Sequence, residues 1–214
     1  YPNWSPVSGS KEIVFVNTTG PEDFTIYVLS YGQGEPRAVK TFSNQVLFTS
    51  WSRDGSKIVF LQLGKKGIFT IPAEGGKPVP ITNNQGWESV EFAQASPARD
   101  MVLYISHVGT DFYLNEISLS GGDPHTIASF SGGREYPRSL AESYDGTLVA
   151  YTSPGIRPGY NVYLVPLKGG NRIQVTAFSY AQLNNPSWSS DGKKLVAQFD
   201  QGLYIVELKE GIIP

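Results

Sequence analysis

One motif returns along this chain at a nearly constant interval, and this repetition limits the possible folds more than any other feature. Each copy places a short polar turn after an apolar stretch, and the copies read NWSP (3–6), WSRDG (51–55), ASPAR (95–99), ESYDG (142–146) and WSSDG (188–192). The equivalent positions in the five copies are Trp4, Trp51, Ala95, Glu142 and Trp188. The intervals between them are 47, 44, 47 and 46 residues. Five copies of one motif at a nearly constant interval indicate an internal structural repeat.

Each repeat contains four short strands, and residues 47–83 show the pattern most clearly. An apolar stretch leads to Trp51, and three further stretches follow at 57–61, 68–71 and 79–82. Glycine-containing turns separate them, which predicts an antiparallel meander. The second strands are expected at 12–16, 57–61, 101–105, 148–152 and 195–199, and the third strands at 25–29, 67–71, 115–119, 161–165 and 202–206.

A four-stranded meander that repeats every forty-odd residues is typical of a β-propeller blade. A single twisted sheet that is apolar on both faces cannot bury either face alone, so blades pack face to face. We therefore predict an all-β, single-domain β-propeller of four-stranded antiparallel blades. The five blades are expected at about 1–46, 47–87, 88–137, 138–183 and 184–214.

The predicted blade count is four full blades and about three quarters of a fifth, because residues 211–214 fall where a fourth strand should start. Two interpretations stay open. The chain is either a five-bladed ring with a clipped outer strand or part of a longer propeller of six or more blades. An open version would expose the apolar faces of its terminal blades, and we would then expect self-association.

Composition excludes several classes of protein. Charged residues make up 17% of the chain and hydrophobic residues 40%, which argues against disorder. The net charge is −2 and the few basic residues are dispersed, so no nucleic-acid partner is expected. No stretch approaches the roughly 18 apolar residues of a membrane span. Cysteine is absent, which excludes disulfides and thiolate metal sites.

The repeats resemble those of a known family. The sequences WSRDGSKIVF (51–60) and WSSDGKKLVAQF (188–199) are similar to the WSPDGkkIaf motif of TolB-type (PD40, WD40-like) β-propeller repeats. The Gly-Gly-x-Pro turn and the following strand ending in Thr, seen within 67–82, are similar as well. The pattern departs in the third blade, which lacks Asp-Gly, and in the fourth, where Glu142 replaces Trp.

The resemblance implies a binding platform in a bacterial periplasmic or extracellular setting. Proteins with such repeats include TolB, which binds partner peptides through its propeller, and the propeller domains that gate prolyl-oligopeptidase-like peptidases. Sensor and surface domains of larger bacterial proteins also contain them. Because one fold serves many functions, the resemblance does not name a ligand.

The recurring acidic and aromatic residues are expected to be structural. Asp54, Asp145 and Asp191 each precede a glycine, so capping a hairpin turn is favoured over a metal or acid–base role. The tryptophans that recur at one repeat, Trp4, Trp51 and Trp188, are expected to pack between blades, not to form a ligand cage.

No catalytic or cofactor site is expected. His107 and His125 are the only histidines, and their spacing does not match a zinc site. No GxSxG motif marks a nucleophilic serine. We therefore expect neither an enzyme activity, nor a metal, nor a cofactor within this chain.

Binding is expected at the connectors between blades, which should gather around one mouth of the central channel. These connectors lie at 42–45, 83–88, 131–136 and 179–184, and the turns at 107–111 and 157–160 should ring the same face. Their amides and aromatic rings suit a peptide or a carbohydrate. The candidate binding residues are Asn44, Gln45, Asn84, Trp87, Arg134, Glu135, Tyr136, Tyr180 and Gln182. We expect most of the contact energy from Trp87, Arg134, Tyr136 and Tyr180, since Trp, Tyr and Arg dominate interface hot spots.

The function predicted from the sequence is therefore a non-catalytic scaffold that binds a protein or peptide. One alternative is the gating propeller of a serine peptidase whose catalytic domain lies outside this chain, which a downstream GxSxG would reveal. Another is a sensor domain of a larger surface protein, which a neighbouring membrane span of about 20 residues would reveal.

Overall fold

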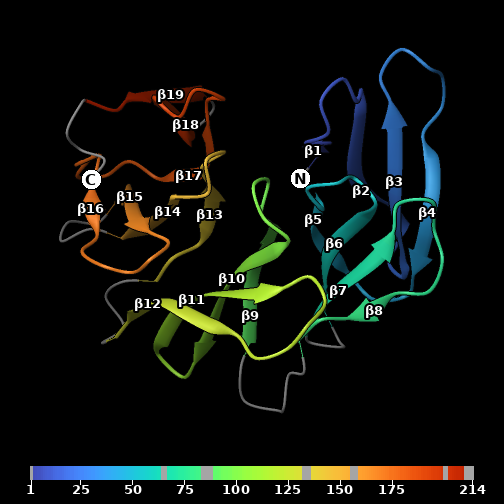
Figure 1. Ribbon diagram of the computed structural model, residues 1–214, viewed down its shortest axis with the longest axis horizontal. Coiled ribbons are helices and arrows are strands. Elements are labelled where there is room, and N and C mark those ends of the chain that lie inside the picture. Colours follow the sequence, from blue (N-terminus) through green and yellow to red (C-terminus); the bar gives the residue numbers. More distant parts are fainter. Residues whose placement is uncertain are drawn as a thin grey trace. The chain divides into compact units, whose positions relative to one another are not determined.

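The structure, a computed structural model, describes residues 2–63, 67–82, 89–131, 136–154, 159–199 and 202–209. All regular structure in these ranges is β-strand (Figure 1). None of the described residues forms a helix of the length and apolarity needed to cross a membrane. The chain divides into two compact units, Tyr1–Leu103 with Glu116–Pro124, and Tyr104–Asn115 with His125–Pro214.

The first unit contains two complete four-stranded sheets. The first sheet has the order β1-β2-β3-β4, formed by β1 (Asn3–Trp4), β2 (Glu12–Gly20), β3 (Asp23–Ser30) and β4 (Arg37–Phe42). The second has the order β5-β6-β7-β8, formed by β5 (Val46–Trp51), β6 (Lys57–Gln62), β7 (Gly67–Pro72) and β8 (Val79–Pro80). All their strand pairs are antiparallel, as a meander requires.

The third sheet contributes residues to both units. It has the order β9-β10-β11-β12, formed by β9 (Ser89–Ala95), β10 (Met101–Val108), β11 (Asp111–Ser118) and β12 (His125–Phe130). The division between the units passes through β10 and β11. Strand β11 starts at Asp111, four residues before the start expected from the sequence.

The second unit contains the last two sheets. The fourth has the order β13-β14-β15-β16, formed by β13 (Ser139–Glu142), β14 (Leu148–Pro154), β15 (Tyr160–Pro166) and β16 (Ile173–Gln174). The fifth has three described strands, β17 (Leu183–Trp188), β18 (Lys194–Phe199) and β19 (Gly202–Glu207). The predicted fold class is confirmed: the chain is all-β, with five antiparallel blades of the β-propeller type.

Burial on both faces explains the apolar runs of the second and third strands. In β6, the side chains of Ile58, Val59, Phe60 and Leu61 are all at most 1% exposed. Ile58 and Phe60 join the core between the first two blades. A matching core forms between the fourth and fifth blades, where Leu195 packs with residues of β14 and β15. Alternate side chains of one strand thus serve two neighbouring interfaces.

An aromatic pair recurs on the blade faces. In each case a ring of the second strand stacks on the paired ring of the third, with centroids 5.5–5.8 Å apart and interplanar angles of 18–21°. These pairs are Phe15–Tyr27, Phe60–Phe69 and Tyr151–Tyr163. The regularity shows that the sequence repeat is also a packing repeat.

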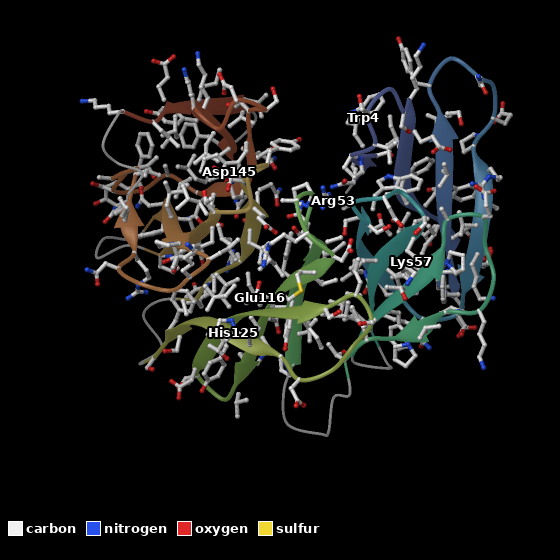
Figure 2. The ribbon with its side chains drawn as sticks, in the orientation of Figure 1. Trp4, Arg53, Lys57, Glu116, His125 and Asp145 are labelled. Atoms are coloured by element: carbon white, nitrogen blue, oxygen red, sulfur yellow. The ribbon has the colours of Figure 1, made fainter. Side chains whose placement is uncertain are left out.

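The recurring aspartates cap hairpin turns, as predicted. Asp54 Oδ1 accepts hydrogen bonds from Ser52 Oγ at 2.6 Å and from the Ser56 main-chain N–H at 3.0 Å. These hydrogen bonds, the one from Ser52 first, lower the pKa of Asp54 to about 2. Asp145, in the turn between β13 and β14 (Figure 2), and Asp191 accept equivalent bonds from Ser143 and Ser189.

Two of the recurring tryptophans link neighbouring blades. Trp51 Nε1–H donates to the Asn3 carbonyl at 3.1 Å, and Trp188 Nε1–H donates to the Ala141 carbonyl at 3.0 Å. Both tryptophans are buried. Each acceptor lies one residue before the tryptophan-equivalent position of the preceding blade. Packing between blades is therefore confirmed for these two residues.

The same prediction is wrong for Trp4. Its side chain is 56% exposed, and its ring lies 6.3 Å from that of Tyr31 (Figure 2). Trp51 and Trp188 are buried because each has a preceding blade in its own unit to pack against. For Trp4, the first unit contains no described strand before β1.

Candidate functional site

The structure places the predicted binding residues in different parts of the molecule. Asn44 and Gln45 lie exposed in the first unit, between β4 and β5, where the Gln45 carbonyl accepts a hydrogen bond from the Leu63 N–H at 2.9 Å. Tyr136, Tyr180 and Gln182 belong to the second unit. The remaining candidates lie outside the described residues; they are Asn84, Trp87, Arg134 and Glu135.

In the second unit, Tyr136 belongs to a chain of aromatic side chains. Its ring lies 5.8 Å from that of Tyr160, edge to face, and the Tyr160 hydroxyl donates to the Tyr136 hydroxyl. Phe112 lies 6.0 Å from Tyr136, and His107 stacks on Phe112 at 5.1 Å. The connector before β13 thus contacts the start of β15 and the start of β11, because all three segments lie at the same end of their blades.

An arginine covers this aromatic group. The Arg138 guanidinium lies 4.3 Å from the centroid of the Tyr160 ring and 5.4 Å from that of Tyr136, within cation–π range. The Arg138 main-chain N–H donates to the Thr152 carbonyl at 3.0 Å, which continues the pairing of β13 with β14. The side chain is exposed, and the described residues offer it no ion pair.

Tyr160 is the fixed centre of the group. It is only 7% exposed. Burial, and next its hydrogen bond with Tyr136, raise the pKa of Tyr160 above the ordinary value for tyrosine, while the charge of Arg138 opposes the shift. The phenol therefore stays protonated and neutral at physiological pH, and acts as a hydrogen-bond donor to Tyr136.

The next connector, 178–182, closes against the same strand. The Tyr160 N–H donates to the Ala181 carbonyl at 2.7 Å, and the buried Asn161 bonds both the N–H and the carbonyl of Phe178, at 2.7 and 3.0 Å. Gly159 lies so close that a Cβ atom there would meet two carbonyl oxygens at 3.1 Å. These contacts hold Tyr180 in an outward position, where it is 81% exposed.

We call this surface the rim site; its described residues are Phe112, Tyr136, Arg138, Tyr160, Tyr180 and Gln182. Sequence reasoning singled out three of them. Arg138 falls outside the connector predicted at 131–136, and Phe112 falls before the third strand predicted at 115–119. Tyr160 lay in a turn assigned to the correct face but was not selected.

The chemistry available at the rim site is that of recognition. It presents aromatic faces, phenol hydroxyls, an amide and one guanidinium. His107, next to it, has its Nδ1 3.2 Å from the Gly109 carbonyl. No group of three His, Asp or Glu side chains able to hold a metal ion occurs among the described residues.

Two cavities lined by described residues of the second unit border β19 and not the rim site. One, of about 380 Å³, is lined by Asn185, Val196, Gln198 and Leu203 among others. The other, of about 370 Å³, lies between residues 175–178 and 204–207. Leu203 and Ile205 on β19 are 76% and 62% exposed. Their equivalents in the second blade, Ile68 and Thr70, are buried.

The fold defines the chain as a β-propeller scaffold. No family model and no curated protein matches the chain. Solved structures do match. A putative TolB from Agrobacterium tumefaciens aligns with a TM-score of 0.73 and 21% identity over 93% of this chain and 69% of that one.

Other solved structures are similar over comparable lengths. An oligogalacturonate lyase from Vibrio parahaemolyticus aligns with a TM-score of 0.72 and 14% identity, over 94% of this chain and 64% of that one. A chain in the nidogen–laminin complex aligns with a TM-score of 0.73 and 13% identity, over 93% and 74%. At these identities the likeness shows the fold, which a putative TolB, a chain of the nidogen–laminin complex and a lyase share.

Proposed function

We propose that this chain is a non-catalytic, TolB-type propeller scaffold that binds a protein or peptide partner through the rim site. The observation that supports this most is the contact between the side chains of Tyr136, Tyr160 and Arg138. The connector bonded to the Tyr160 main chain presents an exposed tyrosine, Tyr180. Tyr and Arg are the residue types that contribute most to protein interfaces.

Preorganisation supports the proposal as well. The Tyr160 ring is fixed by burial and by its hydroxyl bond, and the next connector is fixed by the bonds to Tyr160 and Asn161. A surface that is already ordered loses little conformational entropy when a partner binds. The TolB-type resemblance adds a bacterial periplasmic or extracellular location to the proposal.

The test is selection of a phage-displayed library of 12-residue peptides on the immobilised full chain, followed by affinity measurement for the enriched peptides. Tyr180→Ala should weaken their binding by about 1 to 2 kcal/mol. The matched control is Tyr144→Ala, because Tyr144 is also an exposed tyrosine, at 54%, but lies in the turn between β13 and β14. Equal effects of the two variants, or no enriched peptide, would contradict the proposed function.

A further inference from the structure

The rim site carries a positive charge that its described neighbours do not neutralise. The aromatic rings next to Arg138 belong to Tyr136 and Tyr160, which carry no formal charge at pH 7. Two other arginines of the described chain do have carboxylate partners. Arg99 pairs with Glu116 at 2.7 Å, and Arg37 pairs with Glu74 at 3.5 Å. Arg138 has no such ion pair in the described ranges.

The position of the Arg138 charge is set by its surroundings. The centre of its guanidinium lies over the Tyr160 ring, 4.3 Å from the ring centroid. Stacking leaves the N–H groups at the edge of the guanidinium available to an incoming acceptor. The ring beneath is immobilised by burial and by the Tyr136 hydroxyl, and the Arg138 main chain is bonded to Thr152. The N–H groups of the Arg138 guanidinium are therefore positioned before any ligand binds.

A carboxylate matches this donor best. The guanidinium fork binds the two oxygens of a carboxylate through parallel, charge-assisted hydrogen bonds. The exposed ring of Tyr180 and the half-buried ring of Tyr136 offer apolar area for the residues that flank such a carboxylate in an extended peptide.

We propose that the rim site recognises an acidic side chain, Asp or Glu, of an extended peptide, and that Arg138 is the anchor. The inference rests on the proposed function and deepens it by naming the ligand chemistry. The carboxylate pairs with the edge of the guanidinium, while the peptide on either side contacts Tyr136 and Tyr180.

The experiment uses the peptides enriched on the full chain, synthesised with a fluorescent label and measured by fluorescence anisotropy. Each peptide is compared with a version in which Asp and Glu are replaced by Asn and Gln, and with a version amidated at its C-terminus. The protein variants are Arg138→Gln, Arg138→Lys and the matched control Arg172→Gln. Arg172 is an arginine of the same unit that lies over a different ring, that of Phe130, at 5.1 Å.

Arg138→Gln should weaken the acidic peptide about 10- to 100-fold, and the neutral peptide should bind the unchanged protein equally weakly. The two losses should not add, because both remove one interaction. Arg138→Lys should retain part of the affinity, since the charge stays and the fork is lost. Arg172→Gln should leave the affinity unchanged. Non-additivity separates a direct contact from a general loosening of the loop, which would weaken both peptides alike.

Three results would overturn the inference. If the neutral peptides bind as well as the acidic ones, the rim site binds peptides but not through a carboxylate, and the proposed function survives. If only amidation weakens binding, the terminal carboxylate is the recognised group and the assignment to a side chain is wrong. If no peptide is enriched, the proposed function itself fails, and the inference fails with it.

Discussion

The hydrogen bond from Trp188 to the preceding blade should contribute measurably to stability. Trp188→Phe keeps a large aromatic side chain but removes the indole Nε1–H, which donates a buried hydrogen bond to the Ala141 carbonyl at 3.0 Å. The bond itself is worth about 1 kcal/mol, and the smaller phenyl ring leaves unfilled space in the core, which adds about 1 to 2 kcal/mol. We therefore expect the free energy of unfolding of the second unit to fall by about 2 to 3 kcal/mol.

Repeat equivalence supplies the controls. Trp51→Phe breaks the same bond in the first unit and should have an effect of similar size. Trp4→Phe should change the unfolding free energy by no more than about 0.5 kcal/mol, because Trp4 is 56% exposed. The assay is urea-induced unfolding followed by far-ultraviolet circular dichroism, which does not depend on tryptophan fluorescence. Equal losses for Trp4 and Trp188, or losses below about 0.5 kcal/mol for both Trp51 and Trp188, would refute the assignment.

Three further predictions concern the turn at Asp54, the close packing around Gly159 and the exposed strand β19. The pKa of Asp54 is lowered to about 2 from its ordinary 3.8, so the carboxylate stabilises the fold above about pH 4 and loses this effect as the pH falls towards 2. The melting temperature of Asp54→Asn should therefore depend less on pH between 2 and 5, and an unchanged slope would contradict this. Gly159→Ala should destabilise the second unit by about 1 to 3 kcal/mol, because its Cβ would lie 3.1 Å from two carbonyl oxygens. Gly202→Ala, whose nearest neighbour would be 3.7 Å away, should be nearly neutral in the same urea titration, and equal effects would dismiss the steric argument. Leu203→Lys should reduce any concentration-dependent self-association seen by light scattering with little loss of stability, since Leu203 is 76% exposed; association that is unaffected would place the contact elsewhere.

The fold could be predicted from the sequence because its strongest signals are local and repeated. The Ser-x-Asp-Gly turns need only residues 52–56 and their equivalents to form, and the structure shows the same hydrogen bonds in each. Burial of Trp4 could not be predicted in the same way. Its position in the repeat predicts that a tryptophan can pack against the preceding blade. Burial also requires that such a blade lies next to it.

The site was harder to predict because it depends on contacts between loops that are distant in sequence. Tyr136 and Tyr180 could be selected from loop composition alone. The contact of Arg138 with Tyr160 joins residues 22 positions apart, and it has no equivalent in the described parts of the other blades, so it leaves no repeat signal. Phe112 falls between the turn expected at 107–111 and the strand expected at 115–119, whereas pairing extends β11 back to Asp111.

The hydrogen bonds of the two buried tryptophans run in the same direction along the chain. Each bond runs from a later blade to the carbonyl of an earlier one, from Trp51 to Asn3 and from Trp188 to Ala141. During synthesis from the N-terminus, the acceptor of each bond is therefore made before its donor, and a new blade can dock on a surface that already exists. Removing residues from the C-terminal side removes indole donors and leaves no tryptophan without its acceptor. Removing the first blade would leave the Trp51 indole without its acceptor, so deletions from the two ends should have unequal effects.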